Sequence, residues 1–307
     1  MRPKPGDFFA VMYHYVRPEE TSNLKYLELA EFELMLDYLL EEFGIISREE
    51  WENFRNQGIR PKGAILTFDD GLKDHFNFVA KVLKRRQLFG IFYVCTDPLM
   101  AKPLVVHLTH YLLAHFNPNQ VWEKLLSINE DLPEKIARDK IASFAYLNHD
   151  DPNLVKNIKK VVNWFGEDLG QQQLISDLFL EITGLNLQTF TSDWYLSAED
   201  IKSMSAQGFE FGSHTCSHRL LSKLEASEIK YEIQESQSIL TDIVSSPIKS
   251  FCFPFGGKNS YNSRVLEELK SLKFTDAFSV NQSIVKEESL FELSRFDCNT
   301  FKTRING

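Results

Sequence analysis

The sequence has few of the features that mark secreted, membrane-spanning or nucleic-acid-binding proteins. Its 307 residues include four cysteines, Cys95, Cys216, Cys252 and Cys298, and their spacing shows no paired pattern. We therefore expect reduced thiols and no disulfide framework. Acidic residues outnumber basic ones, and the formal net charge of -9 argues against a general nucleic-acid binder, because such a protein needs a basic face.

Long apolar runs are also missing. The run from Phe8 to Val11 is too short for the core of a signal peptide, and no stretch approaches the ~18 apolar residues needed to cross a bilayer. The sequence contains no repeat and no low-complexity tract. We expect a soluble, cytoplasmic protein without a transmembrane segment, whose oligomeric state the sequence leaves open.

Short apolar runs alternate with helical patterns in the two outer parts of the chain, which predicts an α/β fold with largely parallel strands. The expected strands are Phe8–Tyr13, Ala64–Phe68, Gly90–Cys95, Phe209–Gly212, Ser250–Phe253 and Ala277–Val280. The expected helices are Leu29–Glu42, His75–Arg86, Ala198–Gln207, Ala226–Val244 and Ser263–Leu272.

The middle of the chain breaks this alternation. Between residues 97 and 192 we find helical patterns punctuated by prolines and no convincing strand. The expected helices there are Leu104–Phe116, Val121–Ile128, Pro133–Leu147, Leu154–Phe165 and Gln171–Ile182. We predict one core domain, residues 1–96 and 193–307, with a helical insertion over 97–192; the alternative is an unusually long crossover.

Two adjacent carboxylates follow the predicted strand Ala64–Phe68. Asp69 and Asp70 precede Gly71 at its carboxyl end, which is where ligands bind in α/β folds. Neighbouring residues at a strand end point in different directions, so one carboxylate can bind a metal while the other handles a proton. The structural alternative is a polar turn.

A histidine pair supplies a second set of metal-binding groups. His214 and His218 stand four residues apart, so we expect them on one face of a helix, where both can reach one metal ion. Thr215 follows the first histidine, which excludes the zincin arrangement with its glutamate base. The base must then come from the Asp69-Asp70 pair. The structural alternative is two polar histidines at a helix N-terminus.

The third segment, Ser250–Gly257, reads as a buried strand that leaves into a tight loop. Pro254 removes a backbone donor, and Gly256 lets the backbone approach a ligand closely. Taken alone, this segment is better explained as a strand-terminating turn.

Together, Thr67–Gly71, His214–His218 and Pro254–Gly256 resemble, in order, the motifs of the polysaccharide deacetylase family. The resemblance covers about residues 8–96 and 193–300. It implies a distorted (β/α) barrel and the removal of an acyl group from a sugar.

The resemblance also implies roles for individual residues. The metal ligands would be Asp70, His214 and His218, and the metal would be a divalent cation, zinc first, with Co²⁺, Ni²⁺ or Fe²⁺ as alternatives. Asp69 would be the general base, and the backbone N–H of Phe255 would donate to the oxyanion.

Two departures from the family pattern leave roles open. Cys252 stands where many members carry the arginine that steadies the base. The late histidine that serves as general acid is absent, and Arg295 stands in the corresponding segment. Arg295 could anchor an anionic group of the substrate or pair with Asp69. The leaving nitrogen could receive its proton from Asp69 itself or, alternatively, from His14.

These observations predict a metal-dependent hydrolase that removes an N-acetyl group from an amino sugar. The substrate would be a sugar, a sugar nucleotide or a lipid-linked sugar in surface polysaccharide assembly. Three alternatives stay open: a deformylase or another amide hydrolase with the same site, a sugar-binding homologue with weak turnover, and a ferrous oxygenase. The second carboxylate beside Asp70 and the family resemblance count against the oxygenase.

Overall fold

The computed structural model describes residues 2–19, 22–128, 130–138, 151–162, 171–257, 259–281, 283–285 and 289–305. The chain forms two compact units. Unit 1 comprises Met1–Glu19, Tyr26–Met100 and Asp193–Gly307, and unit 2 comprises Glu20–Lys25 and Ala101–Ser192. The division at residues 97 and 192 drawn from the sequence stays a prediction.

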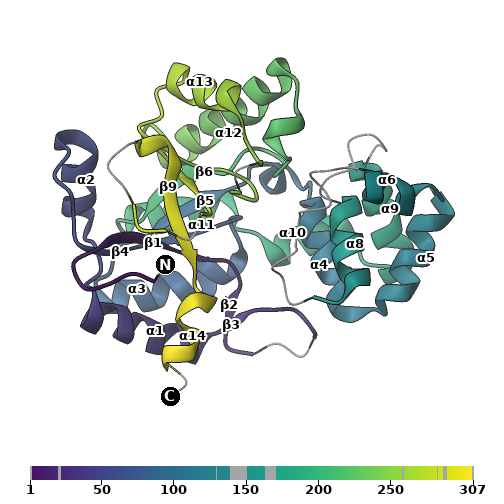
Figure 1. The fold of residues 1–307 in the computed structure, drawn as a ribbon, viewed down its shortest axis with the longest axis horizontal. Helices are drawn as coiled ribbons and strands as arrows, with labels where there is room; N and C mark the ends of the chain where they lie inside the picture. Colours follow the sequence, from purple (N-terminus) through teal and green to yellow (C-terminus); the bar gives the residue numbers. More distant parts are fainter. Residues whose placement is uncertain are drawn as a thin grey trace. The chain divides into compact units, whose positions relative to one another are not determined.

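Unit 1 is built on a closed barrel of seven parallel strands, drawn in Figure 1. In order around the barrel they are β1 (Phe8–Tyr13), β4 (Gly63–Phe68), β5 (Ile91–Val94), β6 (Glu210–Ser213), β7 (Ser250–Cys252), β8 (Asp276–Ser279) and β9 (Leu293–Asp297). The barrel closes where β1 pairs with both β4 and β9, so that Ala10 lies opposite Ile65 on one side and Arg295 on the other. The predicted (β/α) barrel is confirmed.

Helices surround this barrel (Figure 1). They are α1 (Leu29–Glu42), α2 (Arg48–Gln57), α3 (Ala80–Arg86), α11 (Ala198–Ala206), α12 (Ala226–Val244), α13 (Ser263–Ser271) and α14 (Asn299–Ile305). Short elements complete the unit: β2 (Val16–Arg17), β3 (Leu27–Glu28), the π-helix η1 (His75–Val79), and the 3-10 turns η2 (Asp97–Met100), η5 (Leu221–Lys223) and η6 (Leu290–Glu292). Four of the described helices, α1, α2, α11 and α12, begin with capping boxes. In two of them Ser47 pairs with Glu50 and Ser197 with Asp200, and these pairs fix where α2 and α11 start.

Unit 2 is helical in its described part. Its elements are α4 (Val105–His115), α5 (Pro118–Ile128), α6 (Leu132–Arg138), α8 (Asn153–Lys160), α9 (Gln171–Thr183) and α10 (Leu187–Trp194), the last of which leads into unit 1. Tyr111, Phe179 and Phe190 pack edge to face against one another. Parts of the predicted helices Pro133–Leu147 and Leu154–Phe165 lie outside the described residues. No helix that the structure describes is long and apolar enough to cross a membrane.

Strand side chains alternate between the barrel interior and the surrounding helices. The interior cluster includes Phe8, Ala10, Ile65, Ile91, Tyr93, Cys252, Phe278 and Leu293. A Cβ at Gly212 would lie 2.3 Å from the Tyr93 ring, so glycine is needed there for the ring to fill the barrel. Along β4 the interior positions continue from Ile65 through Thr67 to Asp69, which brings this carboxylate to the rim of the barrel.

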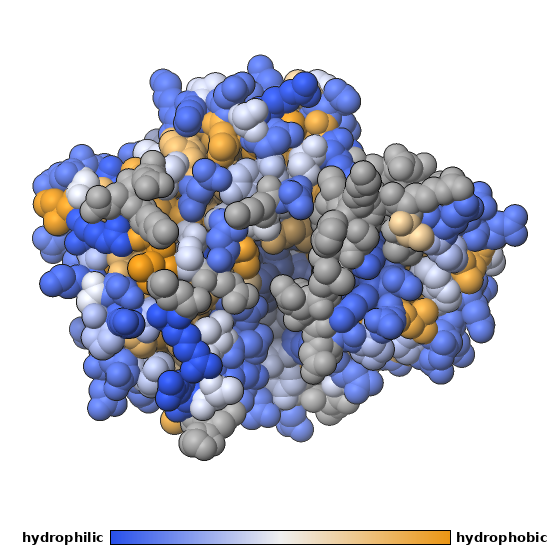
Figure 2. All heavy atoms as spheres, in the orientation of Figure 1, coloured by the Kyte–Doolittle hydropathy of each residue, from blue (hydrophilic) through white to orange (hydrophobic). Residues whose placement is uncertain are grey.

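The surface of the face drawn in Figure 2 is mainly hydrophilic, with separate apolar spots. Large apolar side chains that are exposed include Leu34, Leu40, Ile59 and Tyr231. Scattered exposure of this kind is ordinary for a folded protein and does not by itself mark a binding site.

Candidate metal and catalytic site

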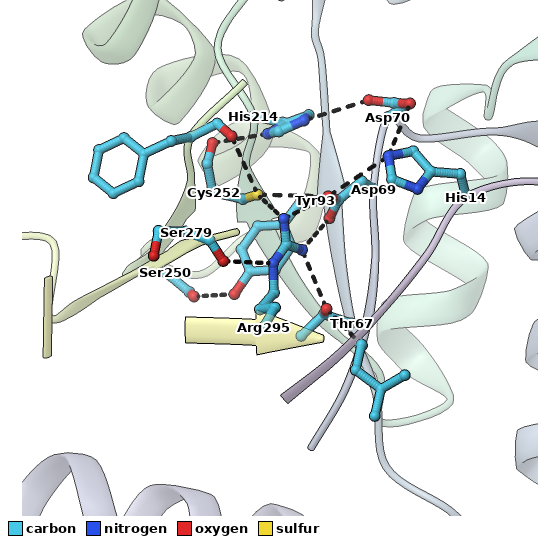
Figure 3. A network of polar contacts seen from close by, with 12 residues as sticks. His14, Thr67, Asp69, Asp70, Tyr93, His214, Ser250, Cys252, Ser279 and Arg295 are labelled. Atoms are coloured by element: carbon cyan, nitrogen blue, oxygen red, sulfur yellow. Dashed lines mark hydrogen bonds and ion pairs between the residues drawn. The ribbon is translucent and has the colours of Figure 1, made fainter. Parts of the chain in front are cut away.

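The two aspartates lie in a left-handed turn directly after β4. Asp70 has a φ of 75° and Gly71 a φ of 65°, a region that an aspartate adopts at some cost and a glycine adopts freely. A Cβ at Gly71 would also lie 2.9 Å from the Val94 side chain. The turn sends the two buried carboxylates in different directions, Asp69 toward Arg295 and Asp70 toward His214 (Figure 3).

The two histidines lie in a turn after β6, so the prediction that they share a helix face is wrong. Left-handed backbone at Thr215 and at His218, with φ of 71° and 60°, folds this turn. The Thr215 hydroxyl accepts a hydrogen bond from the backbone N–H of His218 at 3.0 Å. Two histidines four residues apart can converge in such a turn as well as on a helix, and the spacing does not distinguish the two.

Asp70, His214 and His218 form a group with the donors that a divalent metal needs. Their ligand atoms lie within 4.8 Å of one another, and Asp70 Oδ1 is 3.3 Å from His214 Nε2 and 3.6 Å from His218 Nε2. His214 Nδ1 is 2.7 Å from the Cys252 carbonyl oxygen. Donation to that carbonyl leaves the Nε2 lone pair facing Asp70, as in metal-ligating histidines. The residues present therefore fit a divalent cation.

Asp69 is held by Arg295 of β9, a strand that is separated from β4 by β1 alone, as Figure 3 shows for the two side chains. Nη1 of the guanidinium donates to Oδ1 and Nη2 to Oδ2, each at 2.7 Å. Both side chains are buried, with 1% and 2% exposed. Burial opposes the charged form of Asp69, yet the guanidinium outweighs this and holds the pKa of the carboxyl below its usual value. Of the two roles left open for Arg295, the structure places it on Asp69.

Cys252 lies against this ion pair. Its Sγ lies 3.0 Å from Arg295 Nη2 and 3.7 Å from Asp69 Oδ2. Burial raises the pKa of this thiol, so it stays neutral beside the ion pair. Thr67 accepts a further hydrogen bond from Arg295 Nη1 at 3.2 Å and donates to the Val11 carbonyl. A guanidinium from β9 thus holds this carboxylate next to the cysteine of β7.

His14 and Phe255 also lie at this rim. His14 follows β1, its side chain is 38% exposed, and its Nε2 lies 3.9 Å from Asp69 Oδ2 and 3.8 Å from Asp70 Oδ2. Phe255 packs its ring edge-on against His218, with centroids 4.7 Å apart. A left-handed φ of 62° at Phe255 marks the loop after β7 as another turn under local strain.

Sequence reasoning missed the segment that lies beside the aspartate turn. Leu72 forms an antiparallel bridge with Tyr195, and the backbone N–H of Leu196 donates to the Gly71 carbonyl at 2.8 Å. These contacts hold Trp194, which packs edge-on against Tyr15, near the rim. No motif marks this segment, and only its position directly after the helical stretch could have drawn attention to it.

A family model described as polysaccharide deacetylase matches residues 178–277 of the chain. The resemblance to the polysaccharide deacetylase family is confirmed. The match spans the turn with His214 and His218 and the loop with Phe255, while the aspartate turn lies before it. The structure brings that turn to the same rim.

Solved polysaccharide deacetylases share the fold. A Streptococcus pyogenes deacetylase in complex with acetate is 17% identical, with a TM-score of 0.58 over 95% of this chain and 92% of that one. IcaB from Ammonifex degensii is 14% identical, with a TM-score of 0.59 over the whole of both chains. A de-N-acetylase from Aggregatibacter actinomycetemcomitans is 14% identical, with a TM-score of 0.56 over 97% and 98%. No curated protein matches the sequence significantly.

Proposed function

We propose that this protein is a metal-dependent hydrolase that removes an N-acetyl group from an amino sugar. The observation that carries the proposal is the convergence of Asp70, His214 and His218 within 4.8 Å, next to a second carboxylate, Asp69, that Arg295 holds in place. The family match and the deacetylase fold support a carbohydrate substrate. Zinc is the proposed metal, because one carboxylate and two imidazoles with open positions form a common catalytic zinc set.

Each residue of the proposed site has its own role in the reaction. A divalent cation held by Asp70, His214 and His218 would acidify a water molecule and polarise the acyl oxygen. Asp69, kept ionised by Arg295, takes a proton from the attacking water. The backbone N–H of Phe255 donates to the oxygen on which negative charge develops. The protonated carboxyl of Asp69 then returns its proton to the departing nitrogen, with His14 as the alternative donor.

The proposed substrate is a discrete sugar, a sugar nucleotide or a lipid-linked sugar that serves surface polysaccharide assembly. We place this activity in the cytoplasm. Support comes from the four cysteines, all free and buried in the structure, as expected of a protein from a reducing compartment. A deformylase would use the same groups, so acetylated and formylated amino sugars must be assayed side by side.

The test compares two variants. Asp69→Asn should bind zinc as wild type does while its turnover falls by ~10²–10⁴, as expected for the loss of a general base. His214→Ala should lose stoichiometric metal together with activity. The measurements are elemental analysis of the purified protein and the release of acetate from an N-acetylated amino sugar.

An exposed histidine in unit 2 provides the control. His115→Ala should leave both metal content and acetate release unchanged. Full metal content in His214→Ala, or full activity in Asp69→Asn, would contradict the proposed site. Stoichiometric metal without hydrolysis of either acyl sugar by the wild type would favour a sugar-binding homologue instead.

A further inference from the structure

A buried carboxylate of helix α12 contacts the turn that carries His214 and His218. Glu232 lies on the buried face of this helix and is 3% exposed. One helical turn further along, Ser236 is fully buried and its hydroxyl lies 2.9 Å from that of Ser213, the residue before His214. Two polar side chains of one helix face therefore meet the segment that carries the metal-binding histidines.

The Glu232 carboxylate accepts three hydrogen bonds from the middle of that turn. Its Oε2 accepts from the backbone N–H of Cys216 at 2.9 Å and of Ser217 at 3.0 Å. Its Oε1 accepts from the Ser217 hydroxyl. Burying a carboxylate is unfavourable unless such donors compensate it. The burial of Glu232 is therefore explained by the turn that it binds.

The turn needs stabilising contacts from outside it, because its backbone is left-handed at two non-glycine positions, Thr215 and His218. Such conformations persist where the surrounding structure determines them. Of the three residues between the two histidines, Cys216 and Ser217 are the ones whose N–H groups Glu232 binds. The position of His218 relative to His214 therefore depends on Glu232.

Glu232 does not act as a ligand. Among the described residues, the groups able to hold a metal are Asp70 with His214 and His218, and Asp69 with His214 and Cys252. Glu232 belongs to neither group, and its oxygens are occupied by the turn.

We propose that Glu232 is a positioning residue of the metal centre, which fixes the His214–His218 turn so that both imidazoles face Asp70. This inference rests on the proposed metal site. Outer partners of metal ligands typically contribute about 10- to 100-fold to metal affinity, and a carboxylate that holds the loop between two ligands belongs to this class.

The test is the affinity for zinc, measured by competition with a chelating dye, on wild type, Glu232→Gln and Glu235→Gln. Glu235 is exposed on the same helix, so its variant is matched in charge and chemistry. We expect Glu232→Gln to bind zinc about 10- to 100-fold more weakly and Glu235→Gln to bind it as wild type does. The d–d spectrum of the Co²⁺-loaded protein should change in Glu232→Gln alone.

The melting temperature of each metal-free protein separates positioning from general stability. A Glu232→Gln protein that melts earlier but binds zinc with wild-type affinity and spectrum would overturn the proposal. Should this variant not fold, Ser217→Ala, which removes one of the three donors, takes its place. A smaller loss of affinity is then expected, and unchanged affinity overturns the proposal. Absence of zinc binding by the wild type and by Glu235→Gln would instead refute the proposed metal site.

Discussion

Arg295 is a fully buried cation whose two nitrogens match the two oxygens of one carboxylate. Lysine carries the same charge but cannot span both oxygens. We therefore expect Arg295→Lys to retain metal while kcat falls by about 10- to 100-fold, which is part of the ~10²–10⁴ that loss of the base itself would cost. Arg304→Lys, at an exposed position, is the control. Unchanged kcat in Arg295→Lys would remove the ion pair from the mechanism.

His14 tests the origin of the proton that the leaving amine needs. Its Nε2 lies about equally far from both aspartates. If Asp69 returns the proton, His14→Gln should keep its metal and lose less than about tenfold in kcat, with an unchanged pH profile. A loss of ~10²–10⁴, together with the disappearance of the basic limb of the kcat profile, would make His14 the acid.

At the scale of elements, the π-helix η1 carries a buried histidine that links pH to stability. Burial lowers the pKa of His75 to about 4, and its Nε2 donates to the His14 carbonyl at 3.0 Å. The unfolded chain, with a pKa near 6.5, takes up a proton first as the pH falls. The free energy of unfolding should therefore drop by about 2 kcal/mol between pH 8 and pH 5 through this group.

Denaturation of the metal-free protein by urea at both pH values measures this effect. In His75→Gln, whose amide can donate to the same carbonyl, this part of the pH dependence should vanish. His115→Gln, with an exposed ring, should keep the wild-type dependence. An equal pH dependence in His75→Gln and in the wild type would show that the buried ring is not its source.

The elements differ in how much the sequence reveals about them. β1, α1 and α12 begin and end where apolar periodicity predicts. β9 was missed because Arg295 interrupts its apolar pattern, and only a partner far along the chain, Asp69, explains a charge at an interior position. α2 was missed because it buries one residue, Trp51, although the Ser47–Glu50 capping box was a readable signal.

The candidate site, too, was predictable from the sequence only in part. Motif spacing in the sequence predicted which groups converge, and the structure brings the ligand atoms of Asp70, His214 and His218 together. The backbone that achieves this was not predictable, because left-handed turns at Thr215 and His218 depend on contacts from α12. For Arg295 the sequence left two roles open: to anchor an anionic group of the substrate, or to pair with Asp69. The hydrogen bonds from Arg295 to both oxygens of Asp69 favour the second role.

For the molecule as a whole, a second buried charge network closes the opposite end of the barrel. Arg55 of α2 donates to both oxygens of Glu210, at 2.6 and 3.1 Å, and to Asp276 at 3.4 Å. Burial raises the pKa of both carboxyls, against the influence of Arg55. A helix outside the barrel thus joins the first residues of β6 and β8.

Arg55→Met should leave these carboxylates buried without their cation and lower the free energy of unfolding by about 3–5 kcal/mol at pH 8. Their folded-state pKa values lie above the unfolded ones, so the folded variant takes up protons first as the pH falls. The loss should therefore shrink at pH 5. Urea titrations at both pH values, with Arg264→Met at an exposed position of α13 as the control, measure it. A loss that does not depend on pH would point to packing alone.

The pairing of Asp69 with Arg295 also bears on synthesis at the ribosome. The aspartate emerges early and the arginine late, since β4 and β9 are separated by most of the polypeptide. A nascent chain that has not yet added β9 would contain every proposed metal ligand. Its proposed base would still lack a counter-ion, and its barrel would still lack the last strand. Hydrolytic competence would then arrive abruptly, once β9 has joined the barrel.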